Sequence, residues 1–152
     1  MTLTVRDRGA ARLLKSTLVN VSIKVGVLGT KKHEGSEMTI AQLLEIHELG
    51  LGVPERSVLR AWVTAEQASI DAAMAAAYRK ILLGKLTPEQ AAKILGARFV
   101  GQLQTFISDG RVQPPLAPAT VQAKGSSVPL VDSGQLKSAI SYLVETATKF
   151  GG

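Results

Sequence analysis

The chain of 152 residues contains no cysteine. Disulfide bonds and cysteine-based zinc or redox sites are therefore excluded, which fits an intracellular origin. The sequence also lacks any run of about 18 apolar residues, so we expect no membrane-spanning helix. Charged residues are scattered through the N-terminus, which has no apolar signal-peptide core.

Aromatic residues are scarce as well, at 4% of the chain, and they do not cluster in the sequence. We therefore expect no aromatic platform on which nucleic-acid bases could stack. The only histidines are His33 and His47. His47 lacks a second histidine four residues away, so the spacing of a helical zinc protease is missing. We expect His33 to be solvent-exposed and His47 to lie near a helix C-terminus, where a cation is favoured. No metal site or cofactor is predicted.

Net charge is concentrated at one end of the sequence. Of the formal charge of +6, all lies in residues 1–32, which hold seven basic residues and one acidic residue. The basic N-terminal segment 1–17 contributes Arg6, Arg8 and Arg12, and Lys31 and Lys32 follow later. The ordinary interpretation is a solvated helix face. The functional interpretation is contact with DNA phosphates or with an acidic protein surface.

Apolar periodicity predicts the elements. Apolar residues alternate over 19–29, which indicates a half-buried strand with a bulge or close backbone contact at Gly26. Thr39 with Gln42, and Thr87 with Gln90, form capping boxes that open helices. In the second of these helices we expect another backbone to approach closely at Gly96 and Gly101, and an apolar stripe of Ala91, Ile94, Leu95, Phe99, Leu103 and Phe106. We further expect a helix over 3–16 and two long helices over 65–83 and 88–109. An extended segment over 53–64 should pair in part as a strand, and the last strand should span 138–146. We expect a stiff proline-rich connector over 111–120 and a frayed tail over 147–152.

This order predicts one α+β domain over residues 1–152. A small, mostly antiparallel sheet would pack against several helices, including two long central helices. Before the last strand, we expect a sharp loop that leads into one helical turn. Asp132 or Ser133 would cap that turn, and Gly134 would relieve its backbone. Ser133 is not read as a nucleophile, because the surrounding pattern is not G-x-S-x-G and no histidine is placed to activate it.

Glu55, Arg56 and Arg60 form a charged group after Pro54. In an extended segment, Arg56 and Arg60 would point to the same side. The planar guanidinium of arginine suits pairing with a carboxylate across a subunit interface. An ion pair inside one subunit is the equally weighted alternative.

Two segments resemble one known family. HELGLGVPERSVLRAW (47–62), followed downstream by PPLAPATVQAKGSSVPLVDSGQLKSAI (114–140), is similar to the tail-completion or head–tail joining proteins of long-tailed bacteriophages, also called virion morphogenesis proteins. Leu49 and Val58 stand where the family has phenylalanine, and Ser133 where it has threonine. The matching residues are His47, Glu48, Gly50, Pro54, Glu55, Arg56, Leu59, Arg60, Pro114, Pro115, Thr120, Lys124, Gly125, Pro129, Leu130, Asp132, Gly134, Gln135, Leu136 and Ile140.

The resemblance implies a structural part of the virion neck, assembled in the cytoplasm of the host bacterium, and not an enzyme. It implies a ring, most often of six copies, which contacts neighbouring neck and tail proteins and transiently the genomic DNA, with no membrane partner. The interface residues expected on this basis are Arg6, Arg8, Arg12, Lys31, Lys32, Glu55, Arg56, Arg60, Lys124, Ser126 and Ser127. The alternative is a small basic nucleic-acid-binding module, supported by the pI near 9.8. A hydrolase built on Ser133 ranks third.

Overall fold

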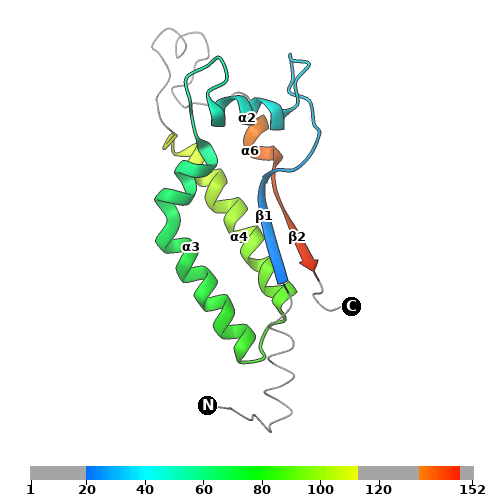
Figure 1. Cartoon of the computed structure of the whole chain (residues 1–152), viewed down its shortest axis with the longest axis vertical. Helices are drawn as coiled ribbons and strands as arrows, with labels where there is room; N and C mark the ends of the chain where they lie inside the picture. The colour runs from blue at the N-terminus through cyan, green and yellow to red at the C-terminus, as the bar shows by residue number, and fades with distance from the viewer. Residues whose placement is uncertain (1–19, 113–133, 148–152) are drawn as a thin grey trace, which may run out of the picture.

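A computed structural model describes residues 20–112 and 134–147 of the chain. Several expectations fall outside these residues: the helix over 3–16 with Arg6, Arg8 and Arg12, the proline-rich connector, the residues from Lys124 to Ser133, and the end of the tail. The described elements, drawn in Figure 1, are β1 (Asn20–Val27), α2 (Ile40–Leu49), α3 (Val58–Leu82), α4 (Pro88–Ser108), α6 (Gln135–Ala139) and β2 (Ile140–Ala147).

The sheet consists of β1 and β2, which pair antiparallel from Asn20 opposite Ala147 to Val27 opposite Ile140. Every residue of one strand faces one residue of the other, so the bulge expected at Gly26 is absent. A Cβ on Gly26 would meet no atom within 4 Å, so no close contact explains this glycine either. The α+β fold class, with a small antiparallel sheet and two long helices, is confirmed.

Helix α4 forms the centre of the core, between α3 and the sheet (Figure 1). Leu103 is fully buried, and the Phe99 ring meets the Trp62 ring of α3 edge-on at 6.2 Å. The apolar stripe predicted for this helix is confirmed except at Ile94, which is 56% exposed. Ile94 precedes the buried Leu95 by one residue and is therefore rotated by about 100° around the helix axis, away from the core.

Tyr142 of β2 lies against α4 at Gly96. A Cβ on Gly96 would come within 2.3 Å of the tyrosine ring, so only glycine leaves room for the ring at this distance. The close approach expected at Gly96 is thus real, although the neighbour is a side chain and not a backbone. At Gly101 no atom lies within 4 Å of the equivalent position, so the same expectation was wrong there.

Helix α3 begins earlier than the sequence predicts. The helix starts at Val58, so residues 58–64 are helical and the strand expected in 53–64 is wrong. Pro54 restrains only the residue before it, and residues 54–57 do precede the helix without regular structure. The cause of the early start is a tertiary contact, described below.

The two capping boxes are confirmed, whereas two other predicted ends are wrong. The N-cap of α6 is Gly134, not Asp132 or Ser133, and the last strand begins at Ile140, not at residue 138. Gln42 and Gln90 each donate a backbone N–H to the hydroxyl of Thr39 and Thr87 at 3.1 Å, and each side chain accepts from the threonine N–H at 2.9 Å. Gly134, with φ +69°, precedes the short helix α6, which leads directly into β2. The helical turn and strand expected at the C-terminal end of the chain therefore exist.

Candidate functional site

Glu48, near the C-terminal end of α2, caps the N-terminus of α3. Its carboxylate accepts hydrogen bonds from the backbone N–H groups of Val58 at 2.7 Å, Leu59 at 3.0 Å and Arg60 at 3.2 Å, and from the Ser57 hydroxyl at 2.7 Å. Ser57 stands at the N-cap position but makes no side-chain cap itself. A carboxylate at a helix N-terminus satisfies free N–H groups and interacts favourably with the helix dipole. This contact starts α3 at Val58.

Arg60 joins the same group of polar contacts. Its Nη2 donates to the Glu48 backbone carbonyl at 2.7 Å and to Glu55 Oε1 at 2.6 Å, while Nε donates to Glu48 Oε1 at 3.4 Å. Glu55 and Arg60 therefore form the ion pair within one subunit that was one of the two sequence interpretations. Arg56 is 9% exposed, and its backbone N–H donates to the His47 carbonyl at 2.7 Å. The extended geometry that would align Arg56 with Arg60 ends at Ser57.

Gly50 makes this junction compact. The residue ends α2 in the left-handed region, with φ +67°, and its N–H donates to the Ile46 carbonyl. A Cβ at this position would lie 3.0 Å from the Cβ of Glu55 and would sit in a backbone conformation that favours glycine. Of the motif HELGLGVPERS, then, Glu48, Gly50 and Glu55 lie together and hold the α2–α3 turn.

The electrostatics of Glu48 reflect these contacts. Burial by itself raises the pKa of the carboxyl, but the hydrogen bonds from Ser57 and from the backbone of Leu59, Arg60 and Val58 outweigh burial. The net pKa is lowered from the ordinary value of 4.5. A carboxyl whose pKa is lower in the folded than in the unfolded state stabilises the fold above its unfolded pKa, and this stabilisation disappears as the pH falls through the folded pKa.

We therefore expect acid to weaken the cap. The stability difference between the wild type and Glu48→Gln should be largest near neutral pH and should shrink as the pH falls below about 4.5. Urea unfolding of both proteins over a pH series measures this difference. A gap that stays constant down to about pH 3 would show that the charge of Glu48 does not contribute.

The second motif meets the first in space. Gln135, which is 8% exposed, accepts the backbone N–H of Glu34 with its Oε1 at 2.9 Å and so fixes the loop that precedes α2. Helix α6 contacts α2, and Leu136 and Ile140 belong to the same buried cluster as Leu44 and Val58. Described residues of both motif segments therefore build one end of the molecule (Figure 1).

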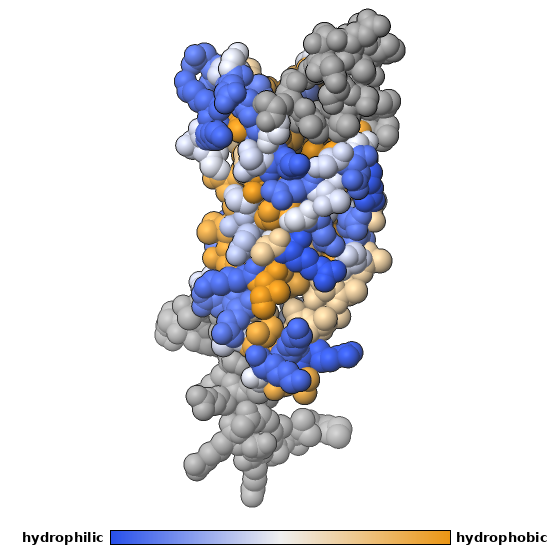
Figure 2. Space-filling model, turned by 180° about the vertical axis from the view of Figure 1, so that it is seen from behind, coloured by the Kyte–Doolittle hydropathy of each residue, from blue (hydrophilic) through white to orange (hydrophobic). Residues whose placement is uncertain are grey.

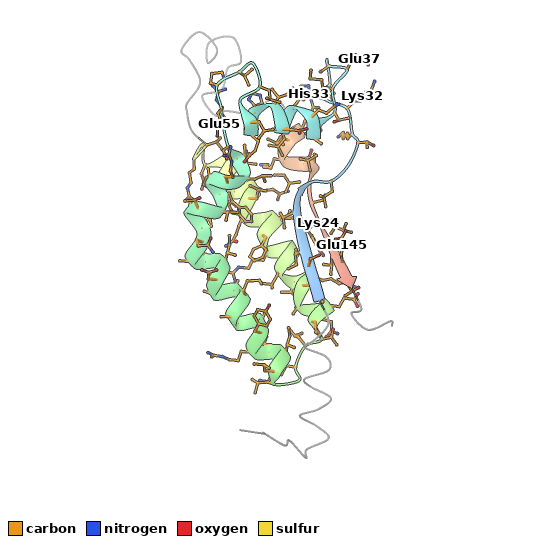
Figure 3. All side chains as sticks on the ribbon, viewed as in Figure 1. Lys24, Lys32, His33, Glu37, Glu55 and Glu145 are labelled. Atoms are coloured by element: carbon orange, nitrogen blue, oxygen red, sulfur yellow. The ribbon has the colours of Figure 1, made fainter. Side chains whose placement is uncertain are left out.

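Lys31, Lys32 and His33 lie in the loop before α2. Lys32 pairs with Glu37 at 2.7 Å, but both side chains are largely exposed, so the pair contributes little to stability. His33 is half-buried and not solvent-exposed as expected, because its backbone bonds to Met38 and Ser36 and folds the loop back on itself. Figure 3 shows Lys32, His33 and Glu37 together in this loop.

A basic cluster that the sequence analysis did not single out lies on the α3–α4 hairpin and reaches the opposite end of the molecule. Arg79 and Lys80 are in the last turn of α3 and Lys85 is in the turn to α4, whereas Arg98 lies midway along α4 and lines one groove with Lys80; all four side chains are exposed. Among the described residues, none of the four forms an ion pair with a carboxylate. The balanced total for residues 33–152 conceals this group, although residues 79–98 hold five basic residues and one acidic residue.

The same end carries exposed apolar side chains and the start of β1. Leu82 and Leu83 are 56% and 62% exposed. Val21 of β1 lines a groove together with Ile81 and Pro88, which places the beginning of β1 beside the α3–α4 turn. The described part of the chain therefore begins at this end of the fold.

No chemical centre stands out in the described part. Across residues 20–112 and 134–147, no group of three or more histidine, aspartate or glutamate side chains could hold a metal ion. No helix of this part is long and apolar enough to cross a membrane. Ser133, the residue of the hydrolase hypothesis, lies outside the described residues.

Comparison with protein-family models, curated proteins and solved structures finds no match to the chain.

Proposed function

We propose that this protein is a structural subunit of a bacteriophage neck. It acts in tail completion or head–tail joining, as one copy in a ring at the head-proximal end of the tail. Six copies is the expected number, and the partners are neighbouring neck and tail proteins of the virion. The proposal adds no catalytic step and no cofactor.

One observation carries the proposal. Glu48, Gly50 and Glu55 of the first motif and Gln135, Leu136 and Ile140 of the second all serve to build the same end of the fold. Residues with such roles maintain the shape of the subunit, as suits a protein that acts by fitting against its neighbours. The neck assignment itself rests on the resemblance of the two segments to the family.

The direct test is to interrupt the gene for this protein in the phage or prophage genome that carries it. A stop codon early in the gene should leave filled heads and separate tails, because the joint between them is missing. Electron microscopy of lysates reads this out, and supplying the wild-type gene in trans should restore joined particles. Fully joined, infectious particles from the interrupted gene would overturn the proposal.

Nucleic-acid binding is a second candidate, favoured by the basic cluster of Arg79, Lys80, Lys85 and Arg98. Such a cluster attracts phosphates in proportion to its charge, and each phosphate contact releases bound counterions. Within a neck, this end would face the DNA that passes through the ring. Outside a neck, it would mark an independent DNA-binding module.

The triple variant Arg79→Ala, Lys80→Ala, Lys85→Ala measures the contribution of the basic cluster to DNA affinity. If the cluster binds DNA, the variant should lose at least about tenfold in affinity for a short duplex, and the slope of log affinity against log salt should fall by about 3. Fluorescence anisotropy over a salt series gives both values. The matched control is Lys31→Ala, Lys32→Ala, Lys137→Ala, which removes equal charge at the opposite end. Equal losses in both variants would contradict a specific site at the cluster.

A further inference from the structure

Both edges of the small sheet are open in the part of the chain that the structure describes. β1 pairs only with β2, and β2 only with β1, over eight residues in each strand. An unpaired edge presents free N–H and C=O groups to another strand, and proteins usually protect it with proline, a bulge, a short strand or charged side chains such as lysine. Neither strand contains proline or a bulge. A sheet of two strands is also barely stable alone.

Apolar grooves follow the free edge of β1. Near its start, Val21 and Ile23 line a groove of about 190 Å³ with Met74 and Tyr78 of α3. Near its end, Val25 to Leu28 line a second groove of about 350 Å³ with α2 and the first turn of α3. No residue of β2 lines either groove. The apolar side chains of β1 are accordingly only half-buried. Figure 2 shows the molecule from behind, where apolar side chains also reach the surface.

The two strands carry opposite charges. Lys24 is the only charged residue of β1, and Glu145 is the only one of β2. Both alternate with the residues that face the core, so they lie on the face of the sheet away from α4. Their charged groups meet within the subunit at 2.9 Å, yet the side chains remain 57% and 46% exposed. Figure 3 labels both side chains on the sheet. Each therefore keeps one side open to a further partner of opposite charge.

We propose that the free edge of β1 binds the free edge of β2 from a second copy of this chain, so that the sheet continues from subunit to subunit around a closed ring. The inference rests on the proposed ring function and names the contact that makes the ring. The neighbour's β2 brings Val144 and Thr146 on the face that turns toward the grooves, and Leu143, 46% exposed, on the other.

Charge selects this head-to-tail contact over a two-fold one. Pairing β1 with the neighbour's β2 places Lys24 beside a second Glu145, whereas pairing β1 with β1 brings two lysines together and pairing β2 with β2 brings two glutamates together. Opposite charges across strands stabilise and like charges destabilise a pair. Because β1 and β2 are antiparallel, a further antiparallel strand keeps all subunits in one orientation, which is what a ring requires.

Cross-linking tests the contact, since the chain has no cysteine of its own. Ser22→Cys marks β1, and Leu143→Cys marks β2; both positions are exposed. The two full-length variants, with different tags, are treated either alone or after co-expression with a short bis-maleimide. Its span must be below the two-strand spacing of about 9–10 Å that would separate equivalent positions of neighbouring subunits in the proposed sheet. The proposal expects a cross-linked dimer that contains both tags, with little cross-linking in either variant alone. A dimer from Ser22→Cys alone or Leu143→Cys alone would overturn it.

Mass measurement by light scattering separates the remaining outcomes. A ring without cross-links at these positions would overturn the sheet contact and leave the ring function standing. A strict monomer without cross-links would count against both. Lys24→Glu should raise the concentration needed for assembly about fivefold, from about 1 kcal/mol per contact, and Lys24→Glu with Glu145→Lys should restore it. Assembly unchanged in Lys24→Glu would overturn the role of this charge pair.

Discussion

Glu48→Ala should lower the free energy of unfolding by about 2–3 kcal/mol. Removing an ordinary N-cap costs about 1 kcal/mol, and this carboxylate serves three backbone N–H groups, the Ser57 hydroxyl and Arg60. Its side chain is 15% exposed, so water replaces these bonds poorly. Urea unfolding at neutral pH, followed by circular dichroism, gives the value.

The matched control is Glu45→Ala, one turn earlier on the exposed side of α2. This change removes the same charge and the same side-chain atoms without touching α3, so we expect an effect within about 0.5 kcal/mol. Equal losses in the two variants would show that the cap does not stabilise the junction.

Gly96→Val should destabilise the protein by about 2–3 kcal/mol. The first added carbon would already lie 2.3 Å from the Tyr142 ring, and the two methyl groups need further room between α4 and β2. Forcing side chains into a packed site costs about 1–3 kcal/mol, which exceeds the small gain in helix propensity over glycine. Thermal and urea unfolding measure the loss.

Gly101→Val tests the same substitution on the same helix, where no atom lies within 4 Å. We expect a change within about 0.5 kcal/mol there. The double variant Gly96→Val, Tyr142→Ala should be less destabilised than the sum of its single variants, because the ring that clashes is gone. Strictly additive losses would mean that the ring is not the obstacle at Gly96.

Local patterns in the sequence determined much of the fold. Alternating apolar residues predicted β1, the threonine–glutamine pairs predicted the starts of α2 and α4, and Gly134 marked the turn into α6 and β2. Each of these signals depends on residues within a few positions of one another. Local sequence is sufficient for them because the hydrogen bonds that they create are local.

The tertiary structure alone decided the features that join distant residues. The start of α3 at Val58 depends on Glu48, ten residues earlier on another helix, and a sequence pattern within α3 does not contain it. Glycine is required at position 96 because the ring of Tyr142 packs there, and Tyr142 comes from β2, which is distant from α4 in the sequence. Lys80 and Arg98 line one groove because the α3–α4 turn folds α4 back along α3. Hydrogen bonds, side-chain packing and charge interactions all require short distances. Residues far apart in the sequence therefore interact only once the fold has brought them together.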